Sequence, residues 1–239
     1  MKFQYLASNF EHKKSTLLLK VFLLVDIMFI IGHIISTLLQ DYFEPGVLRL
    51  FLVTQDRGYP ELFQYLKYLA IVLIVTKRII ASKKYDYLPW LVLFLIMFID
   101  DAFMLHERFG HFFAKILVLQ PAWGLRAVDF GELIYATLMG LMLLGSLLWY
   151  YYKGSGIVKK TFFDIFILFS ILLFFGVAFD MLHQVFEKYN IIYSVFGLIE
   201  DGGEMIALSV LVWYFYFIAS VSDRERTFLY YYFFPKKKI

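Results

Sequence analysis

The chain has 239 residues, of which 61% are hydrophobic and only 18% are charged, and its mean hydropathy is +0.70. One soluble core of this size cannot bury so much apolar surface, so the composition excludes an ordinary soluble domain and predicts membrane-spanning helices. There is no cysteine, which excludes disulfides and thiolate metal ligands, and with a net charge of only +3 we expect no nucleic-acid partner.

The apolar stretches predict one all-α transmembrane domain over residues 1–239, an integral membrane bundle of six helices. Each stretch has about 20 residues or more, which a helix needs to cross the hydrocarbon. The predicted spans are 16–39, 62–80, 88–113, 131–152, 162–186 and 197–220. Pro89 suits the first turn of the third span. Two longer connections, 41–61 and 114–130, contain apolar stretches and are expected to lie on the bilayer surface.

Lys and Arg are unevenly distributed between the two ends of these spans. Fifteen lie in the two termini and in the second-to-third and fourth-to-fifth connections, and six lie on the opposite side. Because cytoplasmic segments carry the excess of basic residues, both termini are predicted in the cytoplasm. We therefore expect a multi-pass protein of the cell membrane, with the lipid bilayer as its surroundings.

Ionisable residues within the spans are the candidate functional residues, because such groups are costly in a membrane and usually face a protein interior or a watery cavity. The first span holds Asp26 and His33, seven residues apart and so on one helix face. The later spans hold Asp100, Asp101, His106 and Glu107, then Asp180 and His183, then Glu200, Asp201 and Glu204. With the predicted orientation, all of these except Asp26 fall at one depth, near the outer leaflet.

This layer contains many more carboxylates than bases, and like charges packed together repel one another. A divalent metal would offset them, and His with Asp or Glu on facing helices is how metal sites form in helix bundles. The expected metal ligands are His33, His106, His183, Asp180 and Glu200, with zinc the first choice of metal. The expected catalytic carboxylates are Asp100, Asp101, Glu107 and Glu204. Two arrangements stay open: a single three-histidine zinc site, and a dinuclear site that uses Asp180-x-x-His183.

Two strings, Asp100–Gly110 (DDAFMLHERFG) and Ile199–Ile206 (IEDGGEMI), resemble a widespread class of small bacterial polytopic membrane proteins. Those proteins carry a D-E/D-x-x-x-x-H-E helix and a later I-E-E-x-x-E-M helix. This chain departs from the pattern at Asp201, where the class usually has Glu. The resemblance implies that the ionisable residues of both strings act as one set, and it implies no particular activity.

Three kinds of function fit such a site. The first is a metal-dependent hydrolase, in which zinc activates water, a carboxylate takes its proton, and a lipid or other amphiphile on the outer side is the substrate. Membrane hydrolases of the ceramidase–receptor superfamily are analogous in residue types only, because this chain lacks their H-x-x-x-H motif and their seven spans. The second is a cation or proton transporter or channel with an acidic outer vestibule, for which a homo-oligomer would supply a pore. The third is a membrane sensor or effector module. The sequence favours the first narrowly and leaves open whether the protein is an enzyme.

Overall fold

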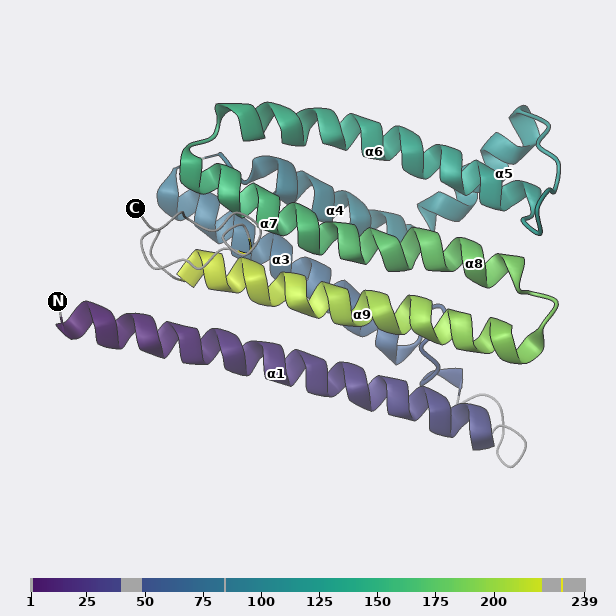
Figure 1. The fold of residues 1–239 in the computed structure, drawn as a ribbon, viewed down its shortest axis with the longest axis horizontal. Helices are drawn as coiled ribbons and strands as arrows, with labels where there is room; N and C mark the ends of the chain where they lie inside the picture. The colour runs from purple at the N-terminus through teal and green to yellow at the C-terminus, as the bar shows by residue number, and fades with distance from the viewer. Residues whose placement is uncertain (1, 40–48, 84, 221–228, 230–239) are drawn as a thin grey trace, which may run out of the picture.

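The computed structural model describes residues 2–39, 49–83, 85–220 and 229, with side chains from residue 13 onward (Figure 1). These residues form helices, and within them there is no strand beyond an isolated bridge between Ala122 and Leu125. In chain order the helices are α1 (Lys2–Leu39), α3 (Tyr59–Ser82), α4 (Leu88–Phe103), α5 (Leu105–Ile116), α6 (Ala127–Lys153), α7 (Gly156–Leu173), the π-helix η1 (Phe174–Phe179), α8 (Asp180–Val185) and α9 (Asn190–Ser220). The predicted all-α fold is confirmed.

Four helical runs are long and apolar enough to cross a membrane. They are Lys13–Leu39 of α1, α6, the continuous run of α7, η1 and α8, and α9. The pair α4 and α5 has the same property when the two are taken together. Within the residues that the structure describes, four helices are therefore able to span a bilayer, or five if the bent pair is one span.

The predicted third span, 88–113, is not a single helix. α4 ends at Phe103, Met104 adopts a left-handed backbone with φ of 52°, and α5 leaves at an angle of 76° to α4. A non-glycine residue in this conformation interrupts the helical hydrogen bonds, and hydrophobic periodicity carries no signal of it. As a result α5 turns aside and packs against α6.

The two connections predicted to lie on the bilayer surface are only partly helical. Residues 40–48 of the first lie outside the described residues, and residues 49–58 form successive turns. In the second, α5 continues to Ile116, and a short loop then leads to α6. In the described part of these two connections, the named helices are therefore the first residues of α3, the end of α5 and the first turn of α6.

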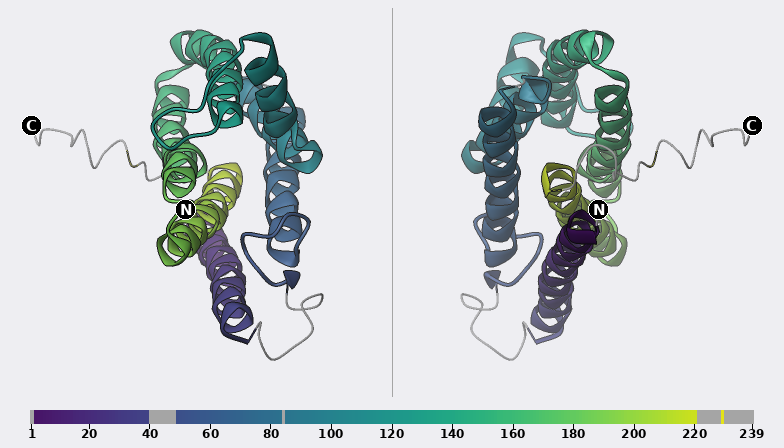
Figure 2. Two further views of the ribbon diagram at one scale, coloured as in Figure 1. Left: turned by 90° about the vertical axis from the view of Figure 1, so that its right-hand side faces the viewer. Right: turned by 90° about the vertical axis from the view of Figure 1, so that its left-hand side faces the viewer.

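The long helices run roughly side by side, so the bundle has two distinct ends (Figure 1). One end, which we call the basic end, holds the starts of α1, α4 and α7 and the ends of α3, α6 and α9. The opposite end, which we call the acidic end, holds the end of α8 and the starts of α3, α6 and α9. Viewed along the helices, α3 with α4 and α7 with α8 lie on opposite sides, and α1 lies at one edge beside α9 (Figure 2).

The apolar core fills the half of the bundle toward the basic end. Trp90 of α4 packs edge-on against Phe162 and Phe169 of α7, and Phe94 packs in the same way against Phe215 of α9. Toward the acidic end these elements bury fewer residues: the buried residues of α4 stop at Phe94, and none of the residues of η1 or α8 is buried. The fold is thus closed by aromatic side chains at one end and is more open at the other.

Gly110 of α5 and Gly131 of α6 are in backbone contact where these helices cross, and a Cβ at Gly131 would overlap the Gly110 carbonyl group. We expect Gly131→Ala to reduce the free energy of unfolding by about 1–3 kcal/mol through overpacking. Gly140→Ala, on the same helix with no atom within 4 Å of the added Cβ, should leave stability unchanged or slightly raised. Unfolding in a denaturing detergent, followed by circular dichroism, measures both. Equal stability of the two variants would contradict the close crossing.

Candidate functional site

Asp100, Asp101 and His106, here called the Asp100 group, come together at the break between α4 and α5. One ligand atom from each lies within 4.8 Å of the others, and His106 Nδ1 is 3.2 Å from Asp100 Oδ2. On a continuous helix, residues six apart would point about 240° apart around the axis. The left-handed turn at Met104 is therefore what returns His106 to Asp100.

Tyrosines from two other helices hold the carboxylates of the Asp100 group. The Tyr135 hydroxyl of α6 donates to Asp100 Oδ1 at 2.8 Å. The buried Tyr68 of α3 hydrogen-bonds to the Asp101 side chain. Hydrogen bonds of this kind fix the orientation of potential metal ligands.

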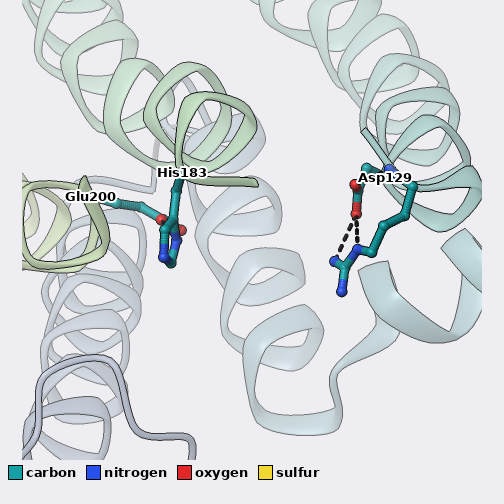
Figure 3. A network of polar contacts seen from close by, with 4 residues as sticks. Asp129, His183 and Glu200 are labelled. Atoms are coloured by element: carbon teal, nitrogen blue, oxygen red, sulfur yellow. Dashed lines mark hydrogen bonds and ion pairs between the residues drawn. The ribbon is translucent and has the colours of Figure 1, made fainter. Parts of the chain in front are cut away.

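Asp180, His183 and Glu200, here called the Asp180 group, form the second cluster. Their ligand atoms also lie within 4.8 Å of one another, and His183 Nδ1 is 2.8 Å from Glu200 Oε2. Figure 3 shows the imidazole from α8 and the carboxylate from α9 pointing toward each other. The His183 ring also packs on Tyr193, with centroids 3.9 Å apart. Asp180 directly follows the π-helix η1, and π-helical turns often occur at functional sites.

Two further carboxylates connect the Asp100 and Asp180 groups. Glu204 of α9 is within electrostatic range of both Asp101 and Asp180, and it packs on Gly176 of η1, where any Cβ would collide with it. Glu132 of α6 is within electrostatic range of both His106 and Asp180. The two groups therefore belong to one layer of half-buried ionisable residues at the acidic end.

Asp129 is also in this region but is already neutralised. It is fully buried, and its Oδ1 accepts hydrogen bonds from Arg126 Nε at 3.0 Å and Nη2 at 2.7 Å (Figure 3). The backbone N–H of Arg126 donates to Oδ2 at 2.6 Å. The hydrogen bonds to Asp129 raise the pKa of the Arg126 guanidinium. Both carboxylate oxygens of Asp129 already accept hydrogen bonds, so neither is free of a partner for a metal.

The model of a family described as a domain of unknown function (DUF8692) matches residues 58–220, more than half of the chain. The chain belongs to this family. Both groups, Glu132 and Glu204 lie within the part that matches DUF8692, whereas α1, with Asp26 and His33, precedes it. No curated protein and no solved structure matches the chain.

Not all of the predicted site residues reach the two groups of this DUF8692 protein. His33 Nδ1 instead accepts a hydrogen bond from the Val53 backbone N–H at 3.1 Å, which holds the turns after residue 49 against α1. Glu107 lies in the first turn of α5 and belongs to neither group. Among the described residues the three histidines do not share one group, so the single three-histidine site does not form.

Sequence reasoning missed the residues that support the groups. Glu132 is close to the start of the predicted fourth span, where a carboxylate is ordinarily taken as facing lipid headgroups. Tyr68 and Tyr135 are in spans rich in aromatic residues, where a tyrosine is ordinarily assigned to packing or to the aromatic belt. The sequence does not indicate which tyrosine hydroxyl will meet an acidic pair on a neighbouring helix. Residue spacing along one helix does not determine how that helix is rotated about its axis relative to the next.

The His183 ring lies directly on Gly197 of α9. A Cβ at this position would be 2.9 Å from His183 Cε1 and 3.0 Å from Nε2. We therefore expect Gly197→Ala to displace the imidazole and to weaken zinc binding by about tenfold or more, because metal sites tolerate little displacement of a ligand. Gly145→Ala, with nothing within 4 Å, is the matched control. Isothermal titration with zinc measures the difference, and unchanged affinity in Gly197→Ala would contradict His183 as a ligand.

Proposed function

We propose that the protein is a metal-dependent membrane hydrolase whose Asp100 and Asp180 groups bind divalent metal and act on a lipid or other amphiphile. The observation that supports it most is the pairing of two His–carboxylate groups in one half-buried layer, with Glu132 and Glu204 between them. Each group offers one imidazole and two carboxylates. Three protein ligands leave a coordination position for water, which is typical of catalytic rather than structural zinc.

The proposed topology has six spans in the cell membrane, with both termini in the cytoplasm. In addition to the four apolar runs, α4 with α5 supplies one span and α3 the sixth. α3 is less apolar, but its Lys67 is fully buried and lies 2.5 Å from Asp26 of α1, which reduces the cost of that charge in the membrane. In this orientation the acidic end faces the outer side.

The proposed roles of individual residues follow from which side-chain oxygen atoms lie near the Asp100 and Asp180 groups. A bound metal would supply a water molecule of lowered pKa. Glu204 lies within electrostatic range of residues of both groups, so its carboxylate would serve as the proton acceptor for either group. Tyr68 and Tyr135 would hold Asp101 and Asp100 in place. Zinc is the first metal to test and manganese the next, because carboxylate ligands outnumber imidazoles.

Elemental analysis of protein purified in mild detergent without chelator tests the metal directly. We expect one or two equivalents of a divalent metal per chain, with loss of one equivalent in Glu200→Gln. Glu187→Gln, which changes an exposed carboxylate at the same end, is the matched control. Release of product from fluorogenic lipid esters and amides by the metal-loaded protein tests the hydrolase. Protein that contains no metal and takes up neither zinc nor manganese would refute the proposal.

The topology yields its own prediction. A reporter that is active only in the cytoplasm, fused after Ile239, should be active, because the basic residues concentrate at that end. The same reporter inserted between Gln120 and Trp123, in the loop before α6, should be inactive. The reverse pattern would place the two groups on the cytoplasmic side and would exclude an outer-leaflet substrate.

A second candidate, a cation or proton transporter, is favoured by polar residues deeper in the bundle. Asp26 accepts from Lys67 and from Ser209 of α9 at 2.6 Å, and the neighbouring Tyr68 contacts the acidic layer. Nearer the basic end, Tyr214 donates to Asp164 at 2.6 Å. The buried Ile71, Leu208 and Leu211 belong to the apolar core. Proton or cation flux into liposomes that persists without bound metal would favour transport over hydrolysis.

A further inference from the structure

The turns formed by residues 49–58, here called the 49–58 segment, lie at the acidic end between the end of α1 and the start of α3 (Figure 1). Three backbone hydrogen bonds of 3.1–3.2 Å, donated by Leu52, Gln55 and Gly58, each close a turn on the carbonyl oxygen three residues earlier. Tyr59, the first residue of α3, donates a further one to the segment at 2.9 Å. The segment is therefore a compact unit attached to the start of α3.

His33 of α1 ties this segment to a second helix. The backbone N–H of Val53 donates to His33 Nδ1 at 3.1 Å, and both residues are buried. Among the described residues, the other hydrogen bonds of the 49–58 segment stay within it or reach α3. A backbone N–H can only donate, so the side chain that faces it has to offer an acceptor. In this part of the chain, His33 is thus the residue whose hydrogen bond fixes the segment to α1.

Thr54, the residue after Val53, brings the segment to the Asp180 group. A Cβ added at Gly197 of α9 would be 3.3 Å from Thr54 Cγ2 and 2.9 Å from His183 Cε1. The Thr54 methyl group and the His183 ring therefore meet beside Gly197. Tyr193 packs on the same ring, with centroids 3.9 Å apart. The imidazole thus has residues of α9 and a residue of the 49–58 segment against it.

We propose that His33 is a positioning residue for the Asp180 group, because it holds the 49–58 segment where Thr54 limits the movement of the His183 ring. This inference rests on the proposed function for metal binding by His183. It deepens that function by adding to the site a helix, α1, that supplies no ligand. Residues that orient a metal ligand without touching the metal commonly change its affinity by about 10–100-fold.

The hold of His33 on the segment is measured without metal. The chain has no cysteine, so Val53→Cys supplies a single thiol that is buried while the segment is in place, and it keeps the backbone N–H. Its labelling by a maleimide in mild detergent should be slow. We expect an added His33→Leu to speed labelling by about tenfold, because the buried N–H then has no acceptor. Thr37→Val is the matched control, since the Thr37 hydroxyl donates to the His33 backbone carbonyl oxygen and not to the segment.

Rescue by asparagine separates the hydrogen bond from packing. His33→Asn places an amide oxygen near the position of Nδ1, and this oxygen can accept from the Val53 N–H. It should therefore restore slow labelling, whereas His33→Leu fills similar space without an acceptor. Labelling that is as fast in His33→Asn as in His33→Leu would overturn the proposal. Labelling that stays slow in His33→Leu would overturn it as well.

Isothermal titration with zinc, on the same His33 variants without the added cysteine, measures the effect on the site. We expect His33→Leu to weaken binding at the Asp180 group, which is the binding lost in Glu200→Gln, by about tenfold. His33→Asn should keep the wild-type affinity. A wild type that binds no zinc but shows the expected labelling pattern would refute the proposed function and leave the hold of His33 on the segment standing. Full zinc affinity in His33→Leu would refute the positioning role alone.

Discussion

His183→Ala is expected to remove the metal of the Asp180 group and with it the part of the stabilisation by zinc that this group provides. The imidazole lies 2.8 Å from Glu200, and without it this group keeps only two carboxylates. A ligand that binds only the folded state stabilises it by about 2.7 kcal/mol at a hundredfold excess over its Kd. Chelation should therefore lower the thermal midpoint of the wild type by more than that of the variant, in which only the Asp100 group remains intact.

The control for this experiment is His111→Ala. His111 is an exposed histidine on α5, at the same end of the bundle, and belongs to neither group. It should keep the full response to chelator and to added zinc. A wild-type protein whose thermal midpoint is the same in chelator and in zinc would refute metal binding, and the acidic layer would then be better explained as a vestibule that attracts cations.

The openness of the acidic end bears on both candidate functions. Asp100, His106 and Asp180 keep partial exposure, whereas Trp90 and Phe94 close the opposite half of the bundle with their aromatic neighbours. A site that is accessible from one side and sealed from the other suits catalysis on a ligand that enters and leaves by the same route. A transporter needs a second conformation in which the aromatic side chains separate.

The helices that could be predicted from the sequence are those whose own apolar composition is sufficient to identify them. Runs such as 197–220 are apolar enough to predict a span without knowledge of their neighbours, and α9 indeed covers Asn190–Ser220. The break at Met104 was not predictable, because a methionine has no local preference for a left-handed backbone and only tertiary packing holds it there. The failure to predict this break affected the predicted site, because on a straight helix the side chains of Asp100 and His106 would point in different directions.

The position of the site residues along the helix axes was easier to predict than their neighbours across the bundle. The sequence placed the acidic residues of three spans in one layer, and the structure brings Asp100, Asp180 and Glu200 to the same end. The partners across helices were not predictable: Glu200 with His183, and Tyr135 with Asp100, depend on how each helix is rotated about its axis. A hydropathy pattern specifies the face toward lipid but not the neighbour on the opposite face.

Lys67→Met is expected to destabilise the bundle by about 3–5 kcal/mol, because it leaves a buried carboxylate without its cation. Lys67 and Asp26 are both 0% exposed, and Lys67 also donates to the Met205 carbonyl oxygen at 2.9 Å. The pair joins α3 to α1, a helix that is otherwise largely exposed. Removal of the cation should therefore loosen α1 before the rest of the bundle, as measured by proteolysis of the connection after Leu39.

The double variant Lys67→Met with Asp26→Asn discriminates between a structural and a transporting role for the pair. It leaves no unpaired buried charge, so it should recover most of the stability lost in Lys67→Met, while Lys20→Met on the exposed surface of α1 should cost little. Equal stability of wild type and Lys67→Met would show that the pair does not form. Because the pair lies outside the Asp100 and Asp180 groups, a hydrolase should keep its metal and its turnover in the double variant. A transporter that carries charge through Asp26 should instead lose its flux although the protein is folded, and that result would reverse the order of the two proposed functions.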